Sequence, residues 1–483
     1  MQHLAAEISR VTRPKTVKMF FKKFFSFALL TIVASQQQKQ NVRRNGNPKK
    51  ASSNQMQTII DSRILQPAES SQKSPNHDGM RQRKKDSGMA FRAIVTYSTE
   101  TGRQLVEKLC SKVYHDFPAD NAIAVELNMT SFELLRAQTS DIVSVEQDSV
   151  WQSQGYLEEH LPLEQNATRR LTELTPYGIT MVQAPWVSYG PYPVTVCLVD
   201  TGVAYGHPDL SKALLSGTNR YSSATGALLE WYHDTDGHGT VVTGIVNAIA
   251  GNNIGVRGVG KIPTYITRGM DNLGMSRESD VLQALDECVA ANAKVISLSL
   301  GGPGLSTAFK AKLDYLYDTK GILTLAAAGN NGQMQAMYPA AYDKVVGVAA
   351  VNQSGTHWHA SNWGPWVEIS APGDRIISTC VNAQGQFVYS MYSGTSMSVP
   401  HAAGVAALLL SHFPQCTNSQ IRFAMAYTAK DVNDGTSLGH AGCDQLTGYG
   451  IVQAFYAYQF LSTHSCIGAT WGRSSTASGC SVL

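Results

Sequence analysis

A serine at the start of an apolar helical stretch is the first feature of this sequence that could do chemistry. Residues 393–404 read SGTSMSVPHAAG, so a glycine-containing turn runs into apolar residues and Ser396 stands at the helix start. Free backbone N–H groups and the positive end of the helix dipole favour a developing negative charge there. The same position also suits a serine that only caps the helix. Ser396 alone therefore leaves a nucleophile and a cap as equal alternatives.

Two upstream segments supply the partners that a serine nucleophile needs. Residues 194–202 (VTVCLVDTG) form an apolar stretch of strand length that ends in Asp200 at a glycine turn. The carboxyl end of a buried parallel strand is a place where ligands bind. Residues 236–244 (DGHGTVVTG) place His238 between two glycines at the start of another apolar helix. The chain order Asp, His, Ser matches one of the convergent arrangements that activate a serine.

These three segments resemble the catalytic motifs of subtilisin-like serine proteases, the subtilases. The resemblance implies that Ser396 is the nucleophile, that His238 is the general base and then acid, and that Asp200 orients the imidazole. A fourth segment, residues 324–332 (TLAAAGNNG), resembles the oxyanion-hole motif of the family and implies that the Asn330 amide is a donor. We therefore predict a serine endopeptidase that works through an acyl-enzyme. The alternative is a catalytically silent binding protein with the same fold.

The resemblance also implies a substrate-binding strand. Residues 295–302 (VISLSLGG) read as a strand and a turn, and the family adds the substrate backbone to this segment as a further strand. A purely structural strand end is the alternative. Uncharged residues 333–338 (QMQAMY) are expected to wall the pocket for the residue before the cut bond, which predicts an apolar or aromatic preference there. The residues implied in substrate binding are Ser299, Leu300, Gly301 and Gly329.

A calcium site is a further implication of the resemblance. Hard cations take oxygen ligands from carboxylates, amides and backbone carbonyls. An ordinary Asn-Gly turn is the alternative, because the loop after His238 differs in length from that of subtilisin. No catalytic cofactor is expected. The candidate ligands are Asp209, the Asn252 side chain, the carbonyls of Ile254 and Val256, and Glu173 near the mature N-terminus.

Composition and charge define the class of protein. The chain has 483 residues, of which 43% are hydrophobic and 16% charged, as in a globular enzyme of two or three domains. Residues 1–88 are net basic, with 17 Lys and Arg against 5 Asp and Glu, whereas the remainder is net acidic, which argues against a nucleic-acid partner. Strand and helix patterns alternate from residue 195 to about 461 and predict a three-layer α/β fold with a parallel sheet. We expect a monomer that acts on proteins or peptides.

The amino-terminal part of the chain predicts a secretory route. Residues 1–35 contain a basic segment, an apolar block and a small-residue cleavage site, the pattern of a signal peptide, with Met19 as an alternative start. The apolar block is too short for an ordinary transmembrane helix, and an uncleaved signal anchor is the alternative. Residues 36–88 are polar and basic and predict a disordered linker. We therefore expect secretion, or a vacuolar or lysosomal destination, and no membrane contact once the signal is removed.

Residues 89–151 predict a small α+β module ahead of the enzyme. Its strand and helix patterns follow a β-α-β-β-α-β order, as in ferredoxin-like domains, and residues 141–148 (DIVSVEQD) resemble the inhibitory propeptide of subtilases. The resemblance implies a zymogen that its own propeptide inhibits, with maturation cleavage anywhere from about Trp151 to Thr172. The remaining predicted parts are a linker with the processing site at residues 152–171, a peptidase domain at 172–462 and a Cys-containing tail at 463–483.

The sequence contains eight cysteines. Cys110 falls in the predicted propeptide and leaves seven, so at least one thiol is free or pairs outside the domain. A secretory route permits disulfides, and we expect the local pairs Cys416–Cys443 and Cys466–Cys480. Cys197 is expected to be a buried hydrophobic residue rather than a nucleophile. Sequons at Asn128, Asn166 and Asn352 are compatible with glycosylation.

Overall fold

The computed structural model describes residues 90–466, apart from residues 162–172 and the single positions 224, 434, 437 and 440. The predicted signal peptide, the basic linker, the sequon at Asn166 and the cysteine Cys480 lie outside the described residues. Within the described part, no helix combines the length and the apolar character that crossing a membrane requires.

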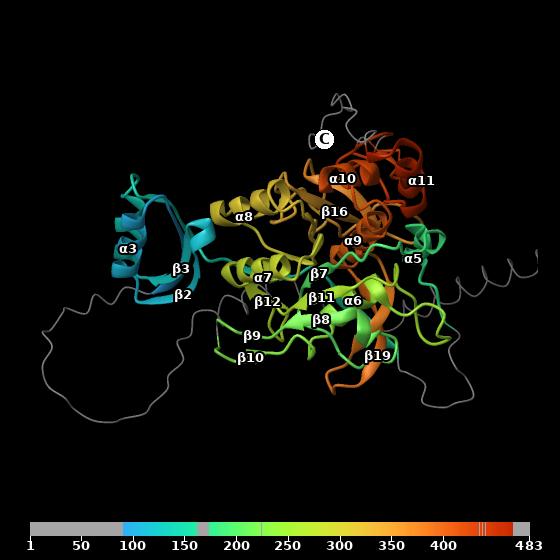
Figure 1. The fold of residues 1–483 in the computed structure, drawn as a ribbon, viewed down its shortest axis with the longest axis horizontal. Helices are drawn as coiled ribbons and strands as arrows, with labels where there is room; N and C mark the ends of the chain where they lie inside the picture. Colours follow the sequence, from blue (N-terminus) through green and yellow to red (C-terminus); the bar gives the residue numbers. More distant parts are fainter. Residues whose placement is uncertain are drawn as a thin grey trace, which may run out of the picture. The chain divides into compact units, whose positions relative to one another are not determined.

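A seven-stranded sheet lies at the centre of the part that follows residue 173 (Figure 1). Neighbouring strands are parallel throughout, in the order β17-β16-β15-β13-β7-β11-β8. Five of them (β7, β13, β15, β16 and β17) are buried along their whole length, which explains their apolar sequences. The predicted parallel α/β sheet is confirmed. The strands are β7 (Val196–Val199), β8 (Leu215–Thr218), β11 (Thr264–Thr267), β13 (Val295–Leu298), β15 (Leu323–Ala327), β16 (Val345–Val351) and β17 (Val367–Pro372).

Helices cover both faces of this sheet and complete the three layers. Alternate residues of β7 belong to different cores: Val196 and Leu198 pack with α6, α9, α10 and α11, whereas Val199 packs with α7 and α8. Figure 1 shows α7 and α8 on the side of the sheet away from α9. The helices are α6 (His238–Asn247), α7 (Glu278–Ala290), α8 (Thr307–Asp318), α9 (Thr395–His412), α10 (Asn418–Tyr427) and α11 (Ala454–His464).

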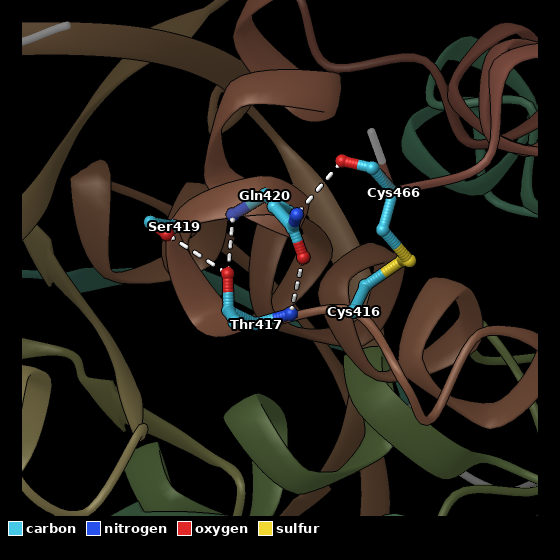
Figure 2. The surroundings of a disulfide bond; sticks show 5 residues. All are labelled: Cys416, Thr417, Ser419, Gln420 and Cys466. Atoms are coloured by element: carbon cyan, nitrogen blue, oxygen red, sulfur yellow. Dashed lines mark hydrogen bonds between the residues drawn. A yellow bond between two sulfur atoms is a disulfide. The ribbon is translucent and has the colours of Figure 1, made fainter. Parts of the chain in front are cut away.

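One disulfide ties the start of α10 to the end of α11. Cys416 bonds to Cys466 (Figure 2), so both predicted local pairs, Cys416–Cys443 and Cys466–Cys480, are wrong. Short separation in sequence misled the prediction, because packing of α10 on α11 brings together residues that lie 50 positions apart. In the chain-entropy model, closing a loop of this length stabilises the fold by about 4 kcal/mol.

A capping arrangement surrounds this disulfide. Thr417 caps α10: its hydroxyl accepts the Gln420 N–H, while the Gln420 side chain accepts the Thr417 N–H. The Gln420 amide also donates to the Cys466 carbonyl at 2.8 Å (Figure 2). The capping box and the disulfide therefore both hold the start of α10.

A second disulfide joins Cys197 in β7 to Cys288 in α7. Cys197 is buried as predicted, but it is not a free thiol. Of the described cysteines, Cys110 and Cys380 carry no disulfide, and Cys380 is buried. The bond links the central sheet to a helix that the small domain also contacts.

The small domain that precedes the sheet has the β-α-β-β-α-β order. Its antiparallel sheet has the strand order β2-β3-β1-β4, and its helices contribute Val106 and Leu135 to a separate core. Its elements are β1 (Phe91–Tyr97), α3 (Glu100–Leu109), β2 (Lys112–Phe117), β3 (Ala122–Leu127), α4 (Met129–Arg136) and β4 (Ile142–Gln147).

After the small domain, the chain adds a strand to each of two further sheets. Strand β5 (Val150–Ser153) lies antiparallel between β12 (Met275–Arg277) and β14 (Leu300–Gly301). Strand β6 (Tyr156–Leu161) lies antiparallel to β19 (Phe387–Ser393), which pairs with β18 (Ile376–Val381). The polar stretch predicted to be a linker is therefore in part regular structure.

Candidate active site

Asp200 and His238 form a buried pair. Asp200 follows β7 and His238 is the first residue of α6, and the distance from His238 Nδ1 to Asp200 Oδ1 is 2.8 Å. Burial is the largest single cause and lowers the pKa of His238, but the carboxylates of Asp200, Asp236 and Asp234 together outweigh it and leave this pKa above its ordinary value. The pair can therefore hold a proton that arrives on the imidazole.

Close backbone approach makes this pair possible. A Cβ on Gly239 would lie 2.1 Å from the Gly202 carbonyl oxygen, so only glycine lets α6 approach the turn after Asp200. The start of α6 is also held by a carboxylate that sequence reasoning missed. Asp234 is buried and accepts the backbone N–H groups of Gly237 and Thr240, both at 2.9 Å. An acidic residue just before a helix was the available signal.

Ser396 lies in the first turn of α9. Its hydroxyl donates to the Ser299 carbonyl at 2.8 Å, and the Ser299 hydroxyl donates to the Ser396 carbonyl at 2.8 Å. Among the described residues, His238 Nε2 has no hydrogen-bond partner. Gly155 lies against both side chains, since a Cβ on it would be 3.1 Å from His238 Nε2 and 3.2 Å from Ser396 Cβ. The side chains of His238 and Ser396 therefore both lie next to Gly155.

The residue before Gly155 presents its carbonyl to the predicted oxyanion site. The Ser396 N–H donates to the Gln154 oxygen at 2.8 Å. Asn330 is oriented by its own oxygen, which accepts the Thr395 N–H and hydroxyl, both at 2.9 Å. A Cβ on Gly394 would lie 2.3 Å from the Gln154 oxygen and 3.1 Å from Asn330 Nδ2. The amide end of Asn330 therefore faces the same space as that carbonyl.

Strand β14 holds the segment before Gln154 in an extended form. Leu300 pairs with Ser153 and Gly301 with Gln152, and the Gln154 N–H donates to the Ser299 carbonyl at 3.1 Å. Three of the predicted substrate-binding residues (Ser299, Leu300 and Gly301) therefore lie along one extended segment.

Gly329 has a different environment from the other three. Its N–H donates to the Thr395 hydroxyl at 3.2 Å. A Cβ on Gly329 would lie 2.4 Å from the Asn362 amide and 2.6 Å from the Met337 side chain. Its φ of 106° also favours glycine. We therefore assign Gly329 to the support of Asn330 and not to a strand contact.

Gln154 and Trp151 both lie against the segment 299–302: Gln154 contacts Gly301, and Trp151 contacts Gly302. The buried Gln154 amide donates to the carbonyls of Gln152 and Gly301. Trp151 is fully buried, with its ring centroid 4.6 Å from that of Phe309. Sequence reasoning missed Trp151 as a site residue, although a tryptophan in a polar stretch was a signal.

A glycine makes room for this tryptophan. A Cβ on Gly302 would lie 2.4 Å from Trp151 Cδ1, so the pocket exists only because residue 302 has no side chain. Gly302 pairs with Tyr338 through two backbone hydrogen bonds, at 2.9 Å and 3.0 Å, which fixes this wall of the pocket. Trp151, three residues before Gln154, therefore packs directly against the backbone of Gly302.

The predicted calcium ligands lie in one region, and the side-chain oxygens of Asp209, Asn252 and Glu173 already accept hydrogen bonds from protein donors. Asp209 accepts the Asn252 amide at 2.6 Å, the Val256 N–H at 2.8 Å and the Tyr389 hydroxyl at 3.2 Å. Glu173 accepts the backbone N–H groups of Gly251 and Asn252. Burial raises the pKa of Asp209 to about 6. Donors around a buried carboxylate do not fit a calcium site, and among the described residues no group of three or more His, Cys, Asp or Glu could hold a metal ion.

We therefore expect the stability of this protein to be independent of calcium. The Tm measured by calorimetry should change by less than about 2 °C, which corresponds to less than about 2 kcal/mol for a chain of this size, when EDTA replaces 5 mM calcium chloride in the buffer. The cluster around Asp209 is satisfied by protein groups, so removal of metal leaves no carboxylate unpaired. A fall of about 10 °C on chelation would contradict this assignment.

The comparisons with known proteins agree with this geometry. Residues 193–450 match the model of the subtilase family. A thermostable alkaline protease of Halalkalibacterium halodurans is 37% identical over 288 residues, which are 58% of this chain and 76% of that protein. Subtilisin E of Bacillus subtilis is 32% identical over 340 residues, 69% of this chain and 81% of that protein.

Two solved structures are similar as well. The subtilisin-like protease Apa1 of Pseudoalteromonas sp. AS-11 has a TM-score of 0.53 at 26% identity and covers 61% of this chain and 99% of its own. Fervidolysin of Fervidobacterium pennivorans, a keratinolytic enzyme related to subtilisin, has a TM-score of 0.63 at 26% identity and covers 78% of this chain and 62% of its own.

Proposed function

We propose that Asp200, His238 and Ser396 form the catalytic triad of this chain, which belongs to the subtilase family of serine endopeptidases. We also propose that the chain is made as an autoinhibited zymogen. The observation that carries this proposal is the hydrogen bond from the Ser396 N–H to the Gln154 carbonyl, inside a cleft that also contains the Asp200–His238 pair. A peptide bound in this way has its carbonyl placed as that of a substrate would be.

The mechanism follows from these contacts. A substrate carbonyl takes the position of the Gln154 carbonyl, and the Ser396 hydroxyl turns from the Ser299 carbonyl to attack it while His238 Nε2 takes the proton. The Ser396 N–H and the Asn330 amide stabilise the oxyanion. His238 then protonates the leaving amine, and water hydrolyses the acyl-enzyme by the reverse proton path. Asp200 keeps the imidazole oriented and stabilises its charged form.

Contacts of the small domain support its role as an inhibitory propeptide. Glu146 accepts the Thr307 N–H and hydroxyl at the start of α8, at 2.8 Å and 2.7 Å. Asp148 accepts the Ser279 N–H and hydroxyl near the start of α7, at 3.0 Å and 2.8 Å. Carboxylates at helix N-termini gain from the unpaired N–H groups and from the helix dipole. Two consecutive caps therefore fix the register in which β5 enters the cleft.

The buried Glu278 makes this docking depend on pH. The pKa of Glu278 is raised to about 8, mainly by burial. A hydrogen bond with Ser306 lowers this pKa, whereas the carboxylates of Asp148 and Glu146 raise it further. Removal of the small domain takes these two carboxylates away, so the part of the rise that they cause is lost and the pKa should fall. The docked state then holds a proton that the separated state releases. Docking should be strongest at acidic pH and weaken as the pH rises through 8.

We expect the small domain to leave the processed protein at least about tenfold faster at pH 9 than at pH 6, since one pKa unit of difference between the two states corresponds to a factor of ten. Size-exclusion chromatography at timed intervals measures this release. Glu278→Gln cannot ionise and should remove most of the pH difference. A wild-type rate that is equal at both pH values would contradict the role of Glu278.

The substrates we propose are unfolded or extended proteins, because the cleft binds main chain through strand pairing. The protein freed of its small domain should hydrolyse casein. A correctly folded and processed protein without hydrolytic activity would overturn the proposal and favour the silent binding protein.

We also propose that the protein is secreted, because residues 1–35 have the pattern of a signal peptide. Sequencing of the N-terminus of protein recovered from the medium tests this proposal.

A further inference from the structure

One peptide bond of the chain is aligned with its own catalytic groups. The Gln154 carbonyl accepts the Ser396 N–H, and Gly155, which supplies the leaving nitrogen of the same bond, lies against His238 Nε2. The nucleophile, the base and the oxyanion donors therefore converge on the bond between residues 154 and 155. This position lies within the range in which the sequence left the cleavage open.

The chain also continues through the leaving-group half of the cleft. Strand β6 pairs with β19 from Tyr156 opposite Ser393 to Leu161 opposite Tyr389, and β19 leads directly into the turn before Ser396. Side chains reinforce this pairing. The His160 ring bonds to the Ser390 hydroxyl at 2.8 Å.

Glu158 provides the main charged contact of this strand. Its carboxylate forms an ion pair with Arg375 at 3.0 Å and accepts a hydrogen bond from the Ser393 hydroxyl. Arg375 is largely exposed, so the ion pair contributes little alone. Most of the binding must come from the backbone ladder and the cross-strand pairs.

We infer that the chain cuts itself between Gln154 and Gly155 and that β6 then stays docked as a second inhibitory strand on the leaving-group side. The inference rests on the proposed function. In the cut, Ser396 Oγ bonds to the Gln154 carbonyl carbon, the Gln154–Gly155 C–N bond breaks, and the serine proton passes through His238 to the Gly155 nitrogen. Water then adds to the ester, which frees a Gln154 carboxylate and restores Ser396 and His238.

The two products of this cut have different fates. Strand β5 leaves with the small domain, whereas β6 is joined covalently to the enzyme and returns at a high effective concentration. Departure of the small domain therefore opens only the half of the cleft that binds residues before the cut bond. Substrates that extend beyond the bond must still displace Tyr156–Leu161 from β19.

Mass spectrometry of the purified full chain after self-processing tests the first part. We expect a new N-terminus at Gly155 and none in Ser396→Ala. Gly155→Val should leave the chain uncut, because a side chain at 155 meets His238 and Ser396. A wild-type chain cut only at another bond overturns the inference and leaves the proposed function intact. A chain that fails to react at Ser396 at all counts instead against the proposed function.

Kinetics of the processed enzyme test the second part. A chain in which a Gly-Ser sequence of equal length replaces Tyr156–Leu161 should hydrolyse a peptide with four residues beyond the cut bond about tenfold faster in kcat/KM, relative to an anilide that lacks them. About five cross-strand pairs at a few tenths of a kcal/mol each give this factor. Glu158→Ala should move the ratio in the same direction and the exposed neighbour Glu159→Ala should not. An unchanged ratio in the replacement chain overturns this part.

Discussion

Replacement of His238 by alanine is expected to lower kcat/KM for peptide hydrolysis by about four orders of magnitude or more. His238 accepts the Ser396 proton and returns it to the leaving nitrogen, and its partner Asp200 acts only through it. The same variant should remain uncut, because the Gly155 nitrogen would lack a proton donor. A fluorogenic peptide assay and an electrophoretic assay of self-processing measure the two effects.

His233→Ala is the matched control for this variant. Its side chain is 63% exposed and lies five residues upstream in the same segment. We expect it to process itself and to keep kcat/KM within about twofold, as is usual for surface substitutions. A His238→Ala enzyme within tenfold of the wild type would remove His238 from the mechanism.

Replacement of Asn330 by alanine should lower kcat about a hundred- to a thousandfold and leave KM nearly unchanged. The Asn330 oxygen is fixed by two donors of Thr395, so its amide is held toward the developing oxyanion before any substrate arrives. Such a donor acts on the transition state more than on the bound ground state. Steady-state kinetics that resolve kcat from KM provide the measurement.

The neighbouring residue offers a control of equal size. The Asn331 amide donates to the Gln335 side chain at 2.7 Å on the surface of the loop. Asn331→Ala should therefore keep kcat within about twofold. If Asn330→Ala instead raised KM and left kcat unchanged, the residue would bind substrate and would not stabilise the oxyanion.

The sequence predicted the parallel sheet and the motif residues that the structure brings together because these features are local. The apolar runs of β7 and β13 are buried on both faces, so periodicity and composition identify them. The motifs around His238 and Ser396 include the glycines that their close packing requires. Each motif thus includes the residues that its own packing requires.

The features that the sequence did not reveal depend on partners far away in the chain. Strand β6 is polar and mostly exposed, and it becomes a strand only because β19 offers an edge more than 200 residues later. The Cys416–Cys466 disulfide follows from the packing of two helices. The hydrogen bond from Tyr389 to Asp209 escaped the sequence for a similar reason, because these residues are 180 positions apart and yet their side chains meet.

The most direct test of the catalytic assignment is labelling with a fluorophosphonate, a reagent that bonds covalently to activated serines. The samples are the wild-type chain before and after processing and Ser396→Ala, with the labelled residue identified by peptide mapping. We predict a single modified serine, Ser396, strongly labelled only after the small domain has left. Labelling of another serine, or labelling that persists in Ser396→Ala, would contradict the account.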